Sequence, residues 1–158
     1  MKETIFHTLW ISSGDAVANV HLIKLSVGTE SVDQMQAWQQ HRSQQRRDGL
    51  YYHLTRMWPK REAELLDGGS IYWVIQGVVL ARQRIARLDE MTGTDGIRRC
   101  AIFLDPKIVR TEAMTRRPFQ GWRYLKPEDA PRDLAPGREP REALPPSLEA
   151  ALAEIGVR

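Results

Sequence analysis

The sequence lacks the features by which most enzymes and metalloproteins are identified. Cys100 is its one cysteine, so an internal disulfide and a cysteine-based zinc cluster are both excluded. The four histidines lie at wide spacings with no HxH or HxxxH pair, and no GxSxG segment is present. We therefore predict no metal site, no cofactor and no serine-hydrolase site.

Long apolar runs are also absent. No window approaches eighteen consecutive apolar residues, and residues 1–20 lack the basic start, continuous apolar stretch and small-residue cleavage site of a secretory signal. These absences predict a soluble, cytoplasmic protein with no membrane partner. The chain has 158 residues, 42% hydrophobic and 27% charged, which is enough for one domain with a core of its own.

Lysine is scarce, with 5 lysines against 18 arginines, and the charge is spread unevenly. The balance is −2 over residues 1–41, +8 over residues 42–126 and −3 over residues 127–158, which sums to +3. The guanidinium group makes two-point contacts with phosphates and carboxylates and stacks on aromatic rings. The basic middle therefore favours an anionic partner, RNA first; the alternative is an ordinary solvated surface.

The order of elements predicts an α+β domain with flanking helices, built on a mostly antiparallel sheet or a small partial β-barrel. A helix capped by Ser31 has a polar tail ending at Gly49, and a short one starts at Pro59 and stops at Gly68. Gly77 leaves a tight turn, a bulge or one bent strand open, whereas Asp95-Gly96 predicts a hairpin. The predicted strands are 20–28, 51–58, 70–76, 78–88, 97–105 and 108–112.

The composition divides the chain into four parts. Residues 1–19 form an N-terminal extension, and residues 20–126 form the single globular domain. Residues 127–146, rich in proline and charge, are predicted to be a linker. Residues 147–158 form a C-terminal helix whose apolar stripe could dock on the domain or on a protein partner.

Two arginines interrupt the apolar strand 78–88. Strict alternation places Arg82 and Arg84 on the face that carries Val78, Leu80 and Leu88, and Arg98 of the next strand is expected to come near. Arginines among apolar neighbours need anions to pair with. Either internal acids supply these anions, or an external phosphate or carboxylate does. The candidate internal acids are Asp89, Glu90 and Asp105.

A second group of candidates lies in RRPFQGWRYLK, residues 116–126. Aromatic rings beside cations are the usual recipe for binding single-stranded nucleic acid. The leading interpretation is a non-catalytic module that binds RNA. The alternative is a small enzyme or ligand-binding protein in which the strand arginines hold a phosphate or carboxylate. The candidate anion-binding residues are Arg82, Arg84, Arg98, Arg116, Arg117, Trp122, Arg123, Tyr124 and Lys126.

Four segments resemble a known family: VHLIKLSVG, RMWPKREAELLDGGSIYWVIQGVVLARQRI, DGIRRCAIFLDP and RRPFQGWRYLKPEDAP. They are similar to the signature segments of a family of uncharacterised bacterial proteins, known as a domain of unknown function. The resemblance covers roughly residues 20–133 and leaves out the first nineteen residues and the acidic tail. It implies a coherent domain and no established activity. The element order also resembles the PUA-like group of small β-barrels, several of which bind RNA or modified bases, an analogy that transfers no residue roles.

Overall fold

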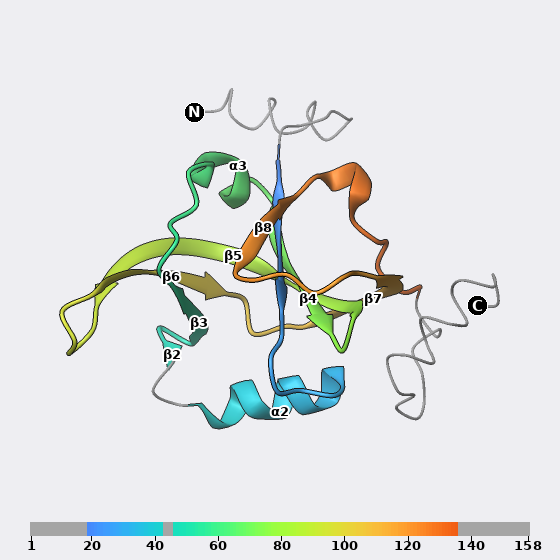
Figure 1. Ribbon diagram of the computed structural model, residues 1–158, viewed down its shortest axis with the longest axis horizontal. Coiled ribbons are helices and arrows are strands. Elements are labelled where there is room, and N and C mark those ends of the chain that lie inside the picture. Colours follow the sequence, from blue (N-terminus) through green and yellow to red (C-terminus); the bar gives the residue numbers. More distant parts are fainter. Residues whose placement is uncertain (1–18, 43–45, 136–158) are drawn as a thin grey trace.

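A mostly antiparallel sheet with two short helices forms the body of the protein (Figure 1). The computed structural model describes residues 19–42 and 46–135. The predicted N-terminal extension, except Asn19, and the predicted C-terminal helix lie outside the described residues. The elements are β1 (His21–Leu25), α2 (Val32–His41), β2 (Arg46–Arg47), β3 (Leu50–Thr55), α3 (Glu62–Leu66), β4 (Ser70–Ile75), β5 (Val78–Thr92), β6 (Arg98–Leu104), β7 (Val109–Thr115), β8 (Trp122–Leu125) and a 3₁₀ helix (Pro127–Asp129).

The strands follow the order β2-β3-β6-β5-β4-β1-β8, and β7 pairs with β5 beside this path. Within the described residues, β1 and β4 are the only parallel neighbours. The two ends of the path, β2 and β8, do not pair with each other in the described part, so the sheet is open. The predicted α+β class with a mostly antiparallel sheet is confirmed; a small partial β-barrel was also predicted, and the sheet shows no barrel closure in the described part.

Two helix predictions differ from the structure at one end each. Ser31 caps α2 as predicted, since its hydroxyl accepts a hydrogen bond from the Gln34 N–H at 3.0 Å. The helix ends at His41, however, and does not continue toward Gly49. The helix predicted to start at Pro59 begins at Glu62. In addition, the sequence pattern did not indicate the strand β8, because Pro118 and Gly121 conceal its short alternation.

The connection between β4 and β5 is a two-residue turn, which settles the question that Gly77 left open. Gln76 and Gly77 both have positive φ angles, 50° and 85°, and Ile75 pairs with Val78 across the turn. Positive φ at both central residues is the requirement of a type I′ turn. The predicted β5–β6 hairpin is also present, with Thr92 opposite Arg98 at its tip.

Strand β5 does not keep a strict two-residue alternation. Its register slips between Val79 and Ala81 against β7, and again between Ile85 and Arg87 against β6. Each slip is a β-bulge, which exchanges the two faces of the strand beyond it. The prediction that both strand arginines share a face with Val78, Leu80 and Leu88 is therefore wrong, because these three belong to the main core.

The two faces of the sheet carry separate apolar clusters. The main core includes Leu22, Trp73 and Ile85, together with Met35 of α2 and Leu65 of α3. The second core lies on the other face, where the chain after β7 covers the sheet. It contains Ile23, Tyr72, Val74, Val79 and Leu125, with Leu25, Met114, Phe119 and Ala130 packed against them.

Residues 127–135, the first part of the predicted linker, pair with the backbone of β7. The Glu112 N–H donates to the Arg132 carbonyl at 2.8 Å, the Leu134 N–H donates to the Arg110 carbonyl at 3.0 Å, and Thr111 forms a β-bridge with Asp133. Low apolar content suggested a linker, but the backbone of β7 and an ion pair hold this segment in place.

Candidate functional site

Arg82 is paired with an internal acid from the end of the described chain. Its Nε and Nη2 donate to the two carboxylate oxygens of Asp133, each at 2.8 Å, and its Nη1 donates to the Ser70 hydroxyl at 3.0 Å. Arg82 lies opposite Tyr72, on the face of the second core. The partner is therefore none of the acids proposed from the sequence.

This ion pair borders an open hollow of about 410 Å³ on the second-core face. His21 and Tyr72 also line the hollow, with ring centroids 5.0 Å apart. The His21 Nδ1 accepts the Ser70 N–H at 3.0 Å, and burial, followed by the positive charge of Arg82, lowers the pKa of His21 to about 4. An external anion in this hollow would have to displace the Asp133 carboxylate from the guanidinium.

The predicted cluster of three strand arginines does not form. Arg84 is exposed, and within residues 19–42 and 46–135 no carboxylate pairs with it. Arg98 lies opposite Thr92 at the hairpin tip, where its Nε and Nη2 donate to the Glu90 carboxylate at 2.8 and 3.1 Å. Of the acids proposed from the sequence, Glu90 therefore pairs with Arg98, and Asp89 pairs with Arg87 at 2.8 Å.

Asp133→Asn is expected to lower the free energy of unfolding by roughly 0.5–1 kcal/mol, because it weakens a two-point ion pair that solvent partly screens. Urea unfolding measures the loss. Glu90→Gln, which weakens the fully exposed Arg98 pair in the same way, is the matched control and should leave the midpoint unchanged. Equal losses of unfolding free energy in the two variants would contradict the expectation that the Asp133–Arg82 ion pair holds residues 127–135 against the sheet.

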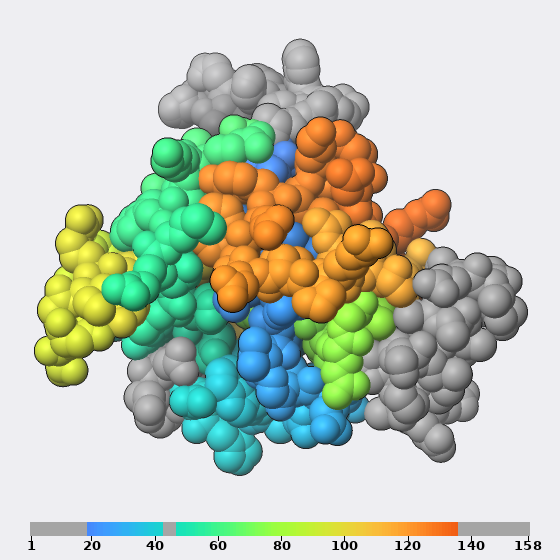
Figure 2. All heavy atoms as spheres, in the orientation of Figure 1, coloured from blue at the N-terminus to red at the C-terminus, as the bar shows by residue number. Residues whose placement is uncertain are grey.

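The segment between β7 and β8 gathers cations around one aromatic ring. The guanidinium carbons of Arg116 and Arg123 lie 5.9 and 5.2 Å from the centroid of the Phe119 ring, and Arg117 is exposed beside them. We call Arg116, Arg117, Phe119 and Arg123 the β8 cluster. In Figure 2 the segment that carries it crosses the middle of the visible face, next to β1 and the β4–β5 turn.

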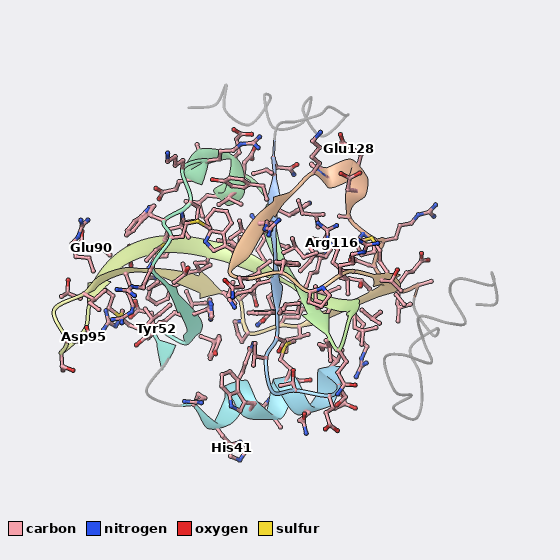
Figure 3. The ribbon with its side chains drawn as sticks, viewed as in Figure 1. His41, Tyr52, Glu90, Asp95, Arg116 and Glu128 are labelled. Carbon is pink, nitrogen blue, oxygen red and sulfur yellow. The ribbon has the colours of Figure 1, made fainter. Side chains whose placement is uncertain are left out.

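The cations of the β8 cluster have no acidic partner in the described part of the chain, since no ion pair involves them there. Figure 3 shows Glu128 at the far end of the same segment, well away from Arg116. Lys126 follows β8 at that end and therefore lies outside the cluster. Sequence analysis identified the arginines and missed Phe119, although its place between Arg117 and Arg123 is a readable signal.

The two aromatic residues proposed as stacking surface are held inside the domain. Trp122 is only 5% exposed, and its indole N–H donates to the Met57 carbonyl at 2.9 Å. The Tyr124 hydroxyl accepts the backbone N–H groups of Lys60 and Arg61 at 2.8 and 3.1 Å. Both residues hold the chain before α3 against β8. Phe119 is therefore the aromatic residue that lies beside the guanidinium groups of Arg116 and Arg123.

A smaller pocket lies on the main-core face, where sequence analysis proposed nothing. It holds about 150 Å³ and is lined by residues of β1, α2, β3 and β4. Burial, followed by the charge of Lys24, lowers the pKa of its residue His53 to about 4. No sequence signal identifies this pocket, because its lining comes from segments far apart in the chain.

Metal and membrane features give no further candidates. Among residues 19–42 and 46–135, no three His, Cys, Asp or Glu side chains are grouped so that they could hold a metal ion. The helices in these ranges are all too short or too polar to span a bilayer. Cys100 is buried, and burial raises the pKa of its thiol to about 12, so it is a core residue.

Comparison with known proteins gives one match. A family model described as "Protein of unknown function (DUF1489)" matches residues 22–158. The match includes the acidic tail, which the resemblance seen in the sequence left out. No curated protein and no solved structure matches the chain.

Proposed function

The chain belongs to the DUF1489 family of proteins of unknown function, and since membership brings no activity, we propose from its own residues that it binds single-stranded RNA through the β8 cluster. The observation that carries the proposal is the contrast between two groups of arginines. Arg82 and Arg98 are neutralised by acids in two-point pairs, whereas Arg116 and Arg123 flank an aromatic ring and pair with no acid among the described residues. Unpaired guanidinium groups favour phosphate.

The ring of Phe119 supports a single-stranded partner over a duplex. Single-stranded RNA exposes its bases, which stack on aromatic side chains, while the phosphates remain free to meet the cations. Phe119 is half-buried against the second core, so the ring is fixed in place and still reaches the surface. Strand β8 is one end of the sheet path, so no described strand pairs with its outer side, where an extended chain could lie.

The alternative, a small-molecule enzyme that uses the strand arginines, has weaker support. Arg82 already has its carboxylate, and Arg98 lies opposite Thr92 at the hairpin tip, far along β5 from Arg82 and Arg84. Three guanidinium groups that do not converge cannot hold one phosphate. We therefore propose a binding module without chemistry of its own.

The double variant R116A/R123A is expected to weaken binding of a uridine-rich oligonucleotide by roughly 10- to 100-fold at low salt, because two phosphate contacts are lost. The slope of log affinity against log salt should become shallower by about 1.4. Fluorescence anisotropy at several salt concentrations measures both quantities. Phe119→Ala should weaken binding without changing the salt slope, since it removes stacking and no charge.

The matched control is R98A/R99A, which removes the same net charge from arginines that are already paired with Glu90 and Asp95. Its affinity and salt slope should stay close to those of the unmodified protein. Equal weakening by the two double variants would show a non-specific charge effect and would contradict the proposal. Failure of the unmodified protein to bind the oligonucleotide at low salt would also contradict it.

A further inference from the structure

The chain between β3 and α3 exposes two large apolar side chains next to each other. Met57 is 51% exposed and Trp58 is 37% exposed. Tryptophan and methionine are enriched at binding surfaces, but single exposed apolar residues are also common on proteins, so exposure alone does not identify such a surface. We call residues 56–60 the Trp58 loop. The way in which this loop is held, its charge and its neighbours all bear on its role.

Hydrogen bonds to β8 hold the Trp58 loop in place on both sides of the exposed ring. Before it, the Met57 carbonyl accepts the Trp122 indole N–H at 2.9 Å. After it, the Lys60 N–H donates to the Tyr124 hydroxyl at 2.8 Å. The backbone that presents Trp58 is therefore ordered, and a partner that binds the ring does not have to order the loop first.

The charge around Trp58 is positive and unpaired. Arg56 and Lys60 are exposed, and neither forms an ion pair within residues 19–42 and 46–135. Arg61, by contrast, is neutralised by Glu64. A flat ring between two unpaired cations suits a partner that carries both negative charge and flat rings, which is the chemistry of a single-stranded nucleic acid.

The Trp58 loop lies next to the segment that carries the β8 cluster. Figure 2 shows the loop, in teal green, beside residues 116–125, in orange, and the bond from Trp122 to Met57 joins the two. Trp122 packs in the main core and Phe119 on the second core, so the loop and the β8 cluster approach β8 from its two faces. The outer edge of β8, with which no described strand pairs, lies between them.

We propose that the Trp58 loop is a second contact for the RNA strand, in which Trp58 stacks on a base and Arg56 and Lys60 bind the adjacent phosphates. The inference rests on the proposed function and extends it, because the strand then crosses the outer edge of β8 with one base on Phe119 and another on Trp58. Every base offers a flat face for stacking. The second contact therefore adds affinity without sequence preference.

Trp58→Ala is expected to weaken binding of the uridine-rich oligonucleotide roughly 10-fold and to leave the salt slope unchanged, because it removes stacking and no charge. Trp58→Phe keeps a flat ring and should recover much of the loss. The matched control is Trp38→Ala on α2, which Figure 1 shows at the opposite end of the domain from α3. Trp38 is 41% exposed, but the guanidinium carbon of Arg42 already lies 4.4 Å from its ring centroid, so its loss should not change the affinity.

Two further measurements report on the parts of the contact. R56A/K60A should weaken binding and make the salt slope shallower by about 1.4, because two phosphate contacts are lost. The oligonucleotide should also quench the tryptophan fluorescence of the protein, and this quenching should fall in Trp58→Phe and persist in Trp38→Phe. Circular dichroism and thermal melting check that all the variants are folded.

The outcomes separate this inference from the proposed function. If R116A/R123A weakens binding while Trp58→Ala and R56A/K60A bind as the unmodified protein does, the β8 cluster stands and the inference is overturned. If only the loop variants weaken binding, the loop contact stands and the role of the β8 cluster fails. Equal weakening by Trp38→Ala and Trp58→Ala also overturns the inference.

An anionic lipid surface is the other partner that exposed tryptophan and cations attract. Co-sedimentation with vesicles of phosphatidylglycerol tests it in parallel. Binding to these vesicles that Trp58→Ala abolishes, in a protein that binds no oligonucleotide at low salt, would identify a lipid-binding loop and overturn the inference. RNA binding that depends on Trp58, without binding to the vesicles, supports it.

Discussion

Gly69→Ala is expected to destabilise the protein by roughly 3 kcal/mol or more, the largest effect of any single substitution proposed for this fold. A Cβ atom at this position would lie 2.4 Å from the Leu65 carbonyl oxygen and 2.5 Å from the Val20 carbonyl oxygen. Both are backbone atoms, so neither can rotate away as a flexible side chain would. The chain must therefore separate α3 from the start of β1 or distort the entry to β4.

The position of Gly69 makes this distortion costly. Its N–H donates to Leu65 at 2.9 Å and closes α3, while its carbonyl accepts the Ile85 N–H at 3.0 Å and begins the pairing of β4 with β5. One residue thus joins a helix end to the centre of the sheet. Urea unfolding followed by circular dichroism measures the loss of stability.

Gly28→Ala provides the control for Gly69→Ala. Gly28 has a φ of +86°, but a Cβ there would meet nothing within 4 Å. Its replacement should cost only about 1 kcal/mol, the strain of a left-handed backbone without a clash. A loss at Gly69 no larger than the loss at Gly28 would show that the backbone around α3 yields easily, against our expectation.

Lowering the pH from 7 to 5 should destabilise the protein through two neutral histidines. His21 and His53 both have their pKa lowered from 6.5 to about 4 in the folded state, in each case mainly by burial. Between these values the unfolded chain binds more protons than the folded one, so stability falls as the pH falls. The loss by pH 5 is roughly 2 kcal/mol for His53 and smaller for His21, which borders an open hollow.

The pH window separates the histidines from the carboxylates. The pKa of Glu90 is lowered from 4.5 and that of Asp95 from 3.8, so their ion pairs lose stability only in more acidic solution. Urea unfolding at pH 7, 6 and 5 therefore reports mainly on the histidines. His53→Gln should remove more than half of the pH slope. His21→Asn, which keeps an acceptor for the Ser70 N–H, should remove most of the rest.

An unchanged slope in both histidine variants would contradict this assignment. It would mean that another group titrates in the window, or that both rings already reach water in the folded state. A slope that disappears in His53→Gln alone would place the whole effect at the pocket.

The sequence predicted the sheet well because alternation and turn chemistry are local. The Ser31 cap, the β5–β6 hairpin and most of the strands could be read from a few neighbouring residues. The face of Arg82 could not, because a β-bulge depends on how β7 pairs with β5. The sequence indicated that Arg82 needs an anion to pair with, from inside or outside the chain. The anion is Asp133, which lies in a segment whose composition suggested a linker.

The candidate sites show the same limit. Arg116 and Arg123 were readable as cations in a short aromatic segment, but the lack of an ion pair to any described acid is a property of the assembled surface. Trp122 stood in that same segment and is nevertheless buried, because burial depends on what covers β8. The pocket around His53 could not be predicted from the sequence at all. It draws its lining from β1, α2, β3 and β4, and no spacing rule connects them.

The position of β1 has a consequence for how the protein is made. This strand pairs with β4 on one side and with β8 on the other, so His21 meets Leu125 from the opposite end of the described chain. During synthesis on the ribosome, one edge of β1 stays open until the C-terminal part of the domain has emerged. Contacts so distant in sequence slow folding and leave strand edges exposed to other chains meanwhile. The sheet, and with it the surface around β8, is therefore completed late in the folding of each newly made chain.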